Sequence, residues 1–179
     1  TTMAKVSDAE AKDGLSLYLE DSSDSANGNT KPVVSRAFTA GAADSGSVSF
    51  SVFIPTAGYV KSTYFYLGTS EGGSSSSRYT ELVFGSKIKF RNEGGSQKDL
   101  VSYDKDKWVD VTVSWDAAHA ITVNIDGTDY TSYDDEGTAV SLLAENDTGA
   151  PTLVALYVGD NGSTGTYSYF DNLDSDLFD

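Results

Sequence analysis

The sequence predicts an all-β protein built as an antiparallel two-sheet β-sandwich of the jelly-roll type. Along the whole chain, short runs of alternating apolar and polar residues are separated by clusters of Gly, Ser, Asn and Asp. Alternation with a period of two is typical of strands that bury one face. No segment of 11 or more residues shows the 3.6-residue period of an amphipathic helix. At least nine strands spaced by turn signals favour a sandwich.

The expected strands follow one another with little between them except turns. In SVSFSVFIP, side chains alternate so that Val48, Phe50, Val52 and Ile54 share one face. LVALYVG is apolar on both faces, which indicates a central strand. In chain order the runs occupy 15–20, 33–38, 47–55, 62–68, 80–84, 87–91, 108–116, 120–127, 153–159 and 166–178.

Two segments allow a more specific prediction of local structure. TELVF and KIKFR are separated by Gly85-Ser86, and a two-residue loop with Gly first favours a type II′ hairpin turn. The segment EGTAVSLLAEND, residues 136–147, is the place where we expect a short helical turn.

Length and composition point to one domain, residues 1–179, with a full-sized core. The absence of Cys excludes a disulfide framework and thiolate chemistry. A formal net charge of -15 argues against nucleic acid and anionic membranes as partners. No apolar run reaches 18 residues, so we expect no membrane span. The start TTMAKVSDAE lacks the basic head and apolar run of a signal peptide, and we expect a mature module from a longer protein.

The charge is unevenly distributed along the chain. Residues 78–107 hold seven cations and five acids, although the protein as a whole has 12 cations and 27 acids. Within this window Lys87, Lys89 and Arg91 alternate with Ile88 and Phe90, so the three cations are expected to share the solvent face of one strand.

Further groups of the type that binds sugars are expected on the same face. Aromatic rings cover the apolar faces of sugar rings, and Arg and Lys form charge-assisted hydrogen bonds to the carboxylates of uronic acids. The alternative is a row of Lys and Arg that only keeps the sheet soluble and discourages edge pairing. The full candidate set is Lys87, Lys89, Arg91, Arg78, Tyr79, Glu81, Tyr64, Tyr66 and Tyr157.

The stretch WVDVTVSWDAAHAITVNIDG, with a Trp opening one strand and an Asp-Gly ending the next, resembles concanavalin A-like and laminin-G-like sandwich domains. The segments LSLYLEDSS…KPVVSRAF and YFDNLDSDLF are similar to the ends of bacterial carbohydrate-binding modules of this fold. Such modules are often appended to polysaccharide lyases and glycoside hydrolases. The resemblance implies that the Asp-Gly turns the chain into a further strand, and it supports fold more strongly than ligand.

Catalysis is not expected. The E-x-D-x-x-E motif of sandwich glucanases is absent, and so are the Gln-x-His and Tyr-x-Lys-x-Gly motifs of sandwich alginate lyases. RYTEL at 78–82 is only faintly similar to the Arg-rich strand of those lyases. The single histidine, His119, lies in a turn-like segment and is expected to be an exposed loop residue. Trp115 is expected in the core, and Trp108 is a weaker candidate for a ligand platform.

A structural calcium ion is the expected cofactor. Ca²⁺ prefers six to eight oxygen ligands, and two Asp-rich and Asn-rich segments offer them. In the modules that the chain resembles, an Asp of the last strand often helps to tie the terminal strands together, and Asp171 matches it best. The alternative is ordinary turn chemistry by these side chains. The candidate ligands are Glu20, Asp21, Asp24 and Asp171.

These observations predict a non-catalytic carbohydrate-binding module. We expect a monomer, secreted or displayed at the bacterial cell surface, whose ligand is an acidic polysaccharide such as alginate or pectin. Its second partner would be an appended catalytic domain, which it holds near the substrate. Two alternatives stay open: a calcium-stabilised spacer or adhesin module, and a divergent polysaccharide lyase.

Overall fold

The chain forms strands almost throughout, as the alternating pattern predicts. The computed structural model describes residues 3–21, 32–71, 76–92, 94–144, 149–159 and 165–179. The strands in these ranges are β1 (Met3–Ser7), β2 (Ser16–Asp21), β3 (Val33–Ala37), β4 (Gly46–Phe53), β5 (Thr63–Gly68), β6 (Arg78–Phe84), β7 (Ile88–Arg91), β8 (Gln97–Val101), β9 (Trp108–Trp115), β10 (Ile121–Ile125), β11 (Thr128–Tyr130), β12 (Ser132–Asp135), β13 (Thr138–Ser141), β14 (Leu153–Val158) and β15 (Thr166–Asp174). Two short 3₁₀ elements, η1 (Thr56–Gly58) and η2 (Asp176–Phe178), are the only helical segments within the same ranges.

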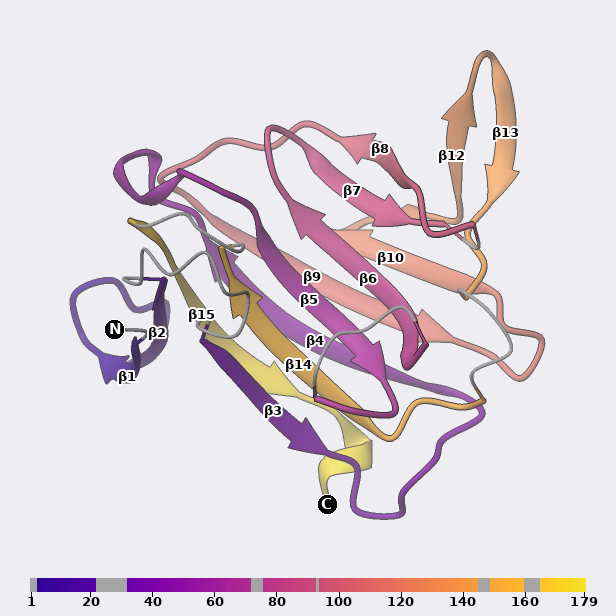
Figure 1. Cartoon of the computed structure of the whole chain (residues 1–179), viewed down its shortest axis with the longest axis horizontal. Coiled ribbons are helices and arrows are strands. Elements are labelled where there is room, and N and C mark those ends of the chain that lie inside the picture. Colours follow the sequence, from indigo (N-terminus) through magenta and orange to yellow (C-terminus); the bar gives the residue numbers. More distant parts are fainter. Residues whose placement is uncertain (1–2, 22–31, 72–75, 93, 145–148, 160–164) are drawn as a thin grey trace.

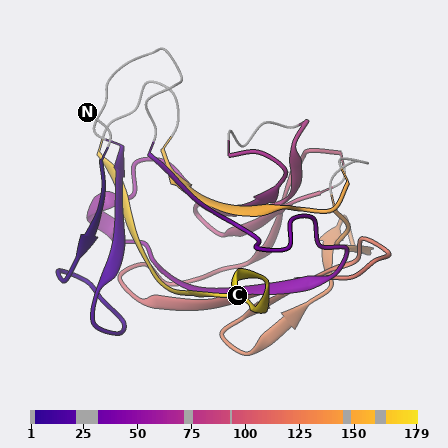
Figure 2. The same cartoon turned by 90° about the horizontal axis from the view of Figure 1, so that it is seen from below.

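The strands assemble into two antiparallel sheets and a separate hairpin (Figure 1). The seven-stranded sheet has the order β1-β2-β15-β4-β9-β10-β11, and the six-stranded sheet has the order β3-β14-β5-β6-β7-β8. The two sheets stack face to face, which confirms the antiparallel two-sheet sandwich (Figure 2). The expected central strand is β14, which pairs with β3 on one side and β5 on the other.

One apolar layer between the sheets contains the core. Because successive side chains of a strand point to opposite faces, Val48, Phe50 and Val52 of β4 enter this layer. Phe50 stacks on Phe65 of the opposite sheet, with ring centroids 4.6 Å apart. Burying a side chain of this size contributes about 1.5–3 kcal/mol. Trp115 also lies in the core, as predicted, and its indole N–H donates to the carbonyl of Ala43 at 2.9 Å.

The turn between β10 and β11 follows from its two residues. Asp126 and Gly127 have φ of 49° and 87°, and two residues in the left-handed region are what a type I′ hairpin requires. Glu136 and Gly137 repeat this pattern between β12 and β13, with φ of 53° and 87°. The described part of the segment 136–147, residues 136–144, begins as a hairpin and contains no helical turn, contrary to the prediction, while 145–147 lie outside the described residues.

The turn between β6 and β7 also differs from the prediction. Phe84 pairs with Ile88, so three residues, 85–87, connect the strands, and the N–H of Gly85 donates to the carbonyl of Lys87 at 3.0 Å. A two-residue loop would place Lys87 opposite Phe84 and turn a cation toward the core. The type II′ turn was wrong, since Gly85 has no positive φ, and Lys87 lies in the turn.

The two layers bend in the same direction. Figure 2 shows the six-stranded sheet, with β14 in orange, on the inner side of this bend, so that its outer face is concave. The seven-stranded sheet lies on the outer side, and its solvent face is convex. Among the described residues, no helix has the length and apolar character needed to cross a lipid bilayer.

Gly68, at the end of β5, is expected to tolerate no side chain. A Cβ placed there would lie 2.2 Å from the backbone oxygen of Ser77 and from the hydroxyl of Tyr66. We expect Gly68→Ala to lower the free energy of unfolding by about 1–3 kcal/mol, measured by urea denaturation, because a backbone atom must move. Gly94→Ala is the control, since its Cβ would meet only Asn92 Oδ1, at 3.7 Å. Equal effects of the two substitutions would contradict this account.

Candidate functional site

The candidate site is a set of polar and aromatic side chains on the concave face of the six-stranded sheet. Tyr64 of β5 pairs with Tyr157 of β14 and Val83 of β6, while Lys89 of β7 lies opposite Val83. The sheet register thus brings segments far apart in the sequence into one row across four strands. We call Tyr64, Tyr157, Glu81, Lys89 and Arg91 the concave strip.

Glu81 is the centre of the concave strip. Its side chain is fully buried, and one carboxylate oxygen accepts a hydrogen bond from Arg91 Nε and forms an ion pair with Arg91 Nη2, each at 2.8 Å. The other oxygen accepts from the hydroxyl of Tyr157 at 2.5 Å. Arg91 Nη1 donates to the carbonyl of Gly95 at 2.8 Å. A buried carboxylate requires this kind of pairing, and the pairing fixes the guanidinium plane.

Tyr64 and Tyr157 form a stacked pair beside Glu81. Their ring centroids are 4.4 Å apart and their planes are inclined by 10°. Burial raises the pKa of the Tyr157 hydroxyl well above its usual value, and the neighbouring Glu81 carboxylate raises it further. Tyr157 therefore stays protonated and donates to Glu81. Tyr64 is only half-buried, so its ring is accessible from the concave side.

Lys87 and Lys89 share one carboxylate on the neighbouring strand β8. Lys87 Nζ lies 2.8 Å from Asp99 Oδ2, and Lys89 Nζ lies 3.5 Å from Asp99 Oδ1. The hydrogen bond from Lys87 holds the pKa of Asp99 below its usual value, and the charge of Lys89 acts in the same direction. Asp99 was not among the predicted site residues, although QKDL follows KIKFR closely enough to predict a neighbouring strand. Among the described residues, the three cations thus meet two carboxylates, so these two carboxylates compensate their charge only partly.

Three of the expected site residues are buried and lie outside the concave strip. The expectation that Tyr79 shares the concave face was wrong. A bulge pairs Leu67 with Thr80 but Gly68 with Arg78, and the extra residue, Tyr79, enters the core. Arg78 and Tyr66 are also buried, and the Tyr66 hydroxyl donates to Ser77 Oγ at 2.9 Å. Tyr66 belongs to the buried cluster that includes Tyr157 and that Tyr64 packs against.

His119 lies away from the concave strip. It is exposed in the turn between β9 and β10, as predicted, with φ of 64°. Its Nδ1 lies 3.1 Å from the Tyr79 hydroxyl. Burial, followed by the charges of Asp116 and Asp44, raises the pKa of Tyr79 to about 12.

The candidate calcium ligands do not come together within the described residues. Thr166 of β15 pairs with Asp21, whereas Asp171 lies five residues further along that strand. The carboxylate of Asp171 accepts three backbone N–H groups, from Lys12, Asp13 and Asn172, at 2.8–3.0 Å. The described ranges contain no group of three or more His, Asp or Glu side chains arranged to hold a metal.

Asp24 lies outside the described residues. Calcium therefore stays a prediction, with Glu20 and Asp21 as the candidate ligands next to that segment.

Comparisons with known proteins show the fold of this chain. No protein-family model matches it, and no curated protein is similar to it in sequence. A solved structure named "Sialidase" matches with a TM-score of 0.63 and 15% identity over 98% of this chain, which corresponds to 16% of the sialidase. Cellulose induced protein Cip1 matches with a TM-score of 0.60 and 14% identity over 97% of this chain and 85% of Cip1.

A family 7 alginate lyase matches with a TM-score of 0.57 and 11% identity over 90% of this chain and 78% of the lyase. At these identities the likeness shows the jelly-roll sandwich and leaves the activity of this chain open.

Removing the buried carboxylate of the concave strip is expected to destabilise the protein. Glu81→Ala would leave the Arg91 guanidinium and the Tyr157 hydroxyl without their shared acceptor. We expect a loss of about 3–5 kcal/mol in the free energy of unfolding, measured by urea denaturation. Asp99→Ala is the matched control, because exposed ion pairs contribute about 0–1 kcal/mol. A loss for Glu81→Ala as small as that for the control would contradict this role.

Stability is expected to fall as the pH rises above about 10. The unfolded chain releases tyrosine protons at the ordinary pKa of 10.0, whereas folded Tyr79 retains its proton to about pH 12 and Tyr157 to still higher pH. The folded state then binds more protons, so the free energy of unfolding decreases with pH, and this contribution is fully present below pH 10. Urea denaturation at several alkaline pH values would measure the slope. Tyr157→Phe should reduce it, and an unchanged slope would contradict the assignment.

Proposed function

We propose that the protein is a non-catalytic carbohydrate-binding module for an acidic polysaccharide such as alginate or pectin. The observation that carries the proposal is that Lys89 and Arg91 share the concave face with the half-buried ring of Tyr64, with Val83 between Tyr64 and Lys89. Cations and an aromatic ring on one face match the two chemical features of a uronic acid, a carboxylate and an apolar ring face.

Arg91 is well prepared to recognise a carboxylate. A guanidinium has five N–H donors; here one is hydrogen-bonded to Glu81 and one to Gly95, and Nη2 also forms an ion pair with Glu81. These contacts immobilise the guanidinium plane and hold its other donors in a fixed orientation. Such preorganisation lowers the entropic cost of binding. Glu81 therefore acts as a positioning residue and does not need to touch the ligand.

Lys89 and Lys87 would supply positive charge that a ligand carboxylate can share with Asp99. Both contact Asp99, which is about half exposed, and an exposed ion pair of this kind contributes little to stability. A uronate carboxylate can therefore replace part of that interaction at small cost. The net charge of -15 repels polyanions at long range, but screening limits that repulsion to about 8 Å at physiological ionic strength.

The structural neighbours support a carbohydrate ligand without fixing its identity. One neighbour is an alginate lyase, and another is named as induced by cellulose. In a secreted bacterial enzyme, this module would hold an appended catalytic domain close to its substrate and raise the effective substrate concentration. The concave strip has no histidine and no second carboxylate beside Glu81 that could complete an acid–base pair. The non-catalytic role rests on this composition.

Affinity gel electrophoresis against alginate, polygalacturonate and a neutral β-glucan tests the proposal. We expect the acidic polymers to retard the protein, and added salt to weaken the retardation because the contacts are charged. Lys87→Ala/Lys89→Ala should lower the affinity about 10-fold, since each lysine loses a charge-assisted hydrogen bond.

The control is Lys5→Ala/Lys107→Ala, which changes the net charge equally but alters residues away from the concave strip. Lys5 belongs to the edge strand β1, and Lys107 pairs only with Asp104. Retardation by acidic polymers that is equal in both double variants would reject the concave strip as the site. No retardation by any polymer would favour the spacer alternative.

A further inference from the structure

The convex face of the seven-stranded sheet carries a polar groove of about 290 Å³. This volume lies just below the usual range for drug-sized ligands, so the groove suits one small ring. Because Val48, Phe50 and Val52 enter the core, Ser49 and Ser51 of β4 face outward. The groove is lined by Lys12, Ser49, Phe50, Ser51, Asp110, Val111, Thr112, Asn124 and Asn172.

Strand register places the polar residues of the groove in two rows across the sheet. Asp171, Ser51 and Asp110 are direct neighbours on β15, β4 and β9. Two residues along the strands, Ser49 lies opposite Thr112, which in turn lies opposite Asn124 of β10. The floor of the groove is therefore a rigid sheet.

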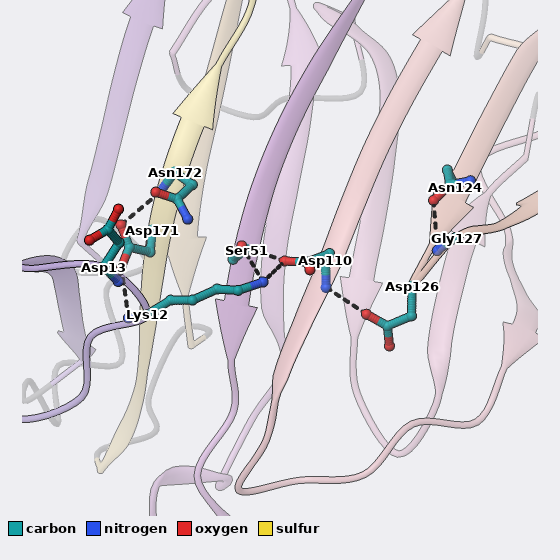
Figure 3. Close-up of polar contacts among 9 residues, drawn as sticks. All are labelled: Lys12, Asp13, Ser51, Asp110, Asn124, Asp126, Gly127, Asp171 and Asn172. Carbon is teal, nitrogen blue, oxygen red and sulfur yellow. Dashed lines mark hydrogen bonds and ion pairs between the residues drawn. The ribbon is translucent and has the colours of Figure 1, made fainter.

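The segment between β1 and β2 builds one wall of the groove. Asp171 accepts the backbone N–H groups of Lys12 and Asp13 at 2.8 and 3.0 Å, and this anchors the segment on β15 (Figure 3). The Lys12 side chain then extends across β4 to Asp110, and its ammonium group also lies 3.5 Å from Ser51 Oγ. The hydrogen bond from Lys12 holds the pKa of Asp110 below its usual value. The lysine charge is thus largely compensated before any ligand arrives.

Several neutral polar groups of the groove have no hydrogen-bond partner among the described residues. Within the described part of the chain, the hydroxyls of Ser49 and Thr112 and the side-chain amide of Asn172 make no hydrogen bond. Asn172 has φ of 53° and lies at an irregularity in the pairing of β15 with β4. Figure 3 shows its amide turned toward β4. Bulges and left-handed residues of this kind often serve to aim a side chain.

An aromatic row lies on the same face but outside the groove. Tyr169, Phe53 and Trp108 are direct neighbours on β15, β4 and β9, with ring centroids 6.1 and 5.5 Å apart. Trp108 precedes Thr112 by four residues, which is about 13 Å along a strand. The paired side chains of Ser51 and Asp110 lie between this row and the hydroxyls of Ser49 and Thr112. The groove itself therefore offers mainly polar contacts.

We propose that this polar groove is a second carbohydrate site, which binds one neutral sugar ring. Unpaired hydroxyls and an amide suit the hydroxyl groups of a pyranose. The exposed carboxylate of Asp110 would repel a uronate, and its pairing with Lys12 leaves no free cation to attract one. The groove lies on the opposite face from the concave strip, so this binding does not depend on the proposed function.

NMR titration of the isotopically labelled protein with glucose, galactose and mannose tests the groove. The assigned backbone amide signals of Ser49 and Thr112, which line the groove, are the reporters. We expect one of these sugars to shift these signals with saturation and a Kd on the order of 1–10 mM. Galacturonate should bind more weakly than galactose at this site.

Variants of the groove separate specific binding from a general solvent effect. Thr112→Val and Asn172→Gly should each weaken binding about 2- to 10-fold, because each removes a hydrogen-bonding group; glycine also accepts the left-handed backbone. Thr122→Val is the control, since Thr122 lies on the same face of β10 but outside the groove.

Lys87→Ala/Lys89→Ala should leave the affinity of the groove for the neutral sugar unchanged. A negative result for the groove can therefore be told apart from a negative result for acidic-polysaccharide binding at the concave strip. A linear shift without saturation for all three sugars, or affinities unaltered by Thr112→Val and Asn172→Gly, would overturn the proposal.

Discussion

The stack of Phe50 on Phe65 across the two sheets is the contact on which the rest of the structure depends. It marks the layer into which every major strand must direct alternate side chains. Aromatic pairs of this geometry contribute about 0.5–1.5 kcal/mol beyond the burial of their surface. Once this layer is filled, the residues between the core positions can only face outward. Both candidate sites consist of these outward residues, so their composition follows from the core.

The concave face is packed more tightly than an ordinary solvated sheet surface. Tyr66, Leu153, Ala155 and Tyr157 form a second, smaller buried cluster on it. Glu81 lies next to this cluster and is fully buried, which demands compensation by Arg91. The outer face thus contains a rigid layer that holds charged groups in place. Rigidity of this kind favours binding by preorganised side chains over adaptation to the ligand.

Much of the fold could be predicted from the sequence because alternation reports directly on burial. The runs at 47–55, 62–68 and 108–116 became strands with the expected faces, and Tyr64 and Tyr157 met as neighbours. The failures share a cause: local pattern does not specify pairing. A bulge opposite Gly68 moved Tyr79 into the core, and the burial of both Phe84 and Ile88 lengthened a turn that appeared to have two residues.

The polar groove could not have been predicted in the same way. It joins Lys12, Ser51 and Asp110, which lie on separate elements and carry no common motif. The pairing of β15, β4 and β9 brings Ser51 and Asp110 together, and Asp171 holds the backbone around Lys12 above the sheet. From the sequence alone, Asp171 could be a calcium ligand or an acceptor for backbone N–H groups. In the structure, its carboxylate accepts the backbone N–H groups of Lys12 and Asp13 and anchors that segment.

The central claim is that the concave strip recognises an acidic sugar, and chemical-shift mapping with a short oligouronate tests it most directly. The account predicts saturable shifts of the backbone amides of β7, β5 and β14, centred on Lys89, Arg91 and Tyr64, with the convex face unaffected. Saturable shifts confined to the seven-stranded sheet, or no shifts at millimolar oligouronate, would contradict it.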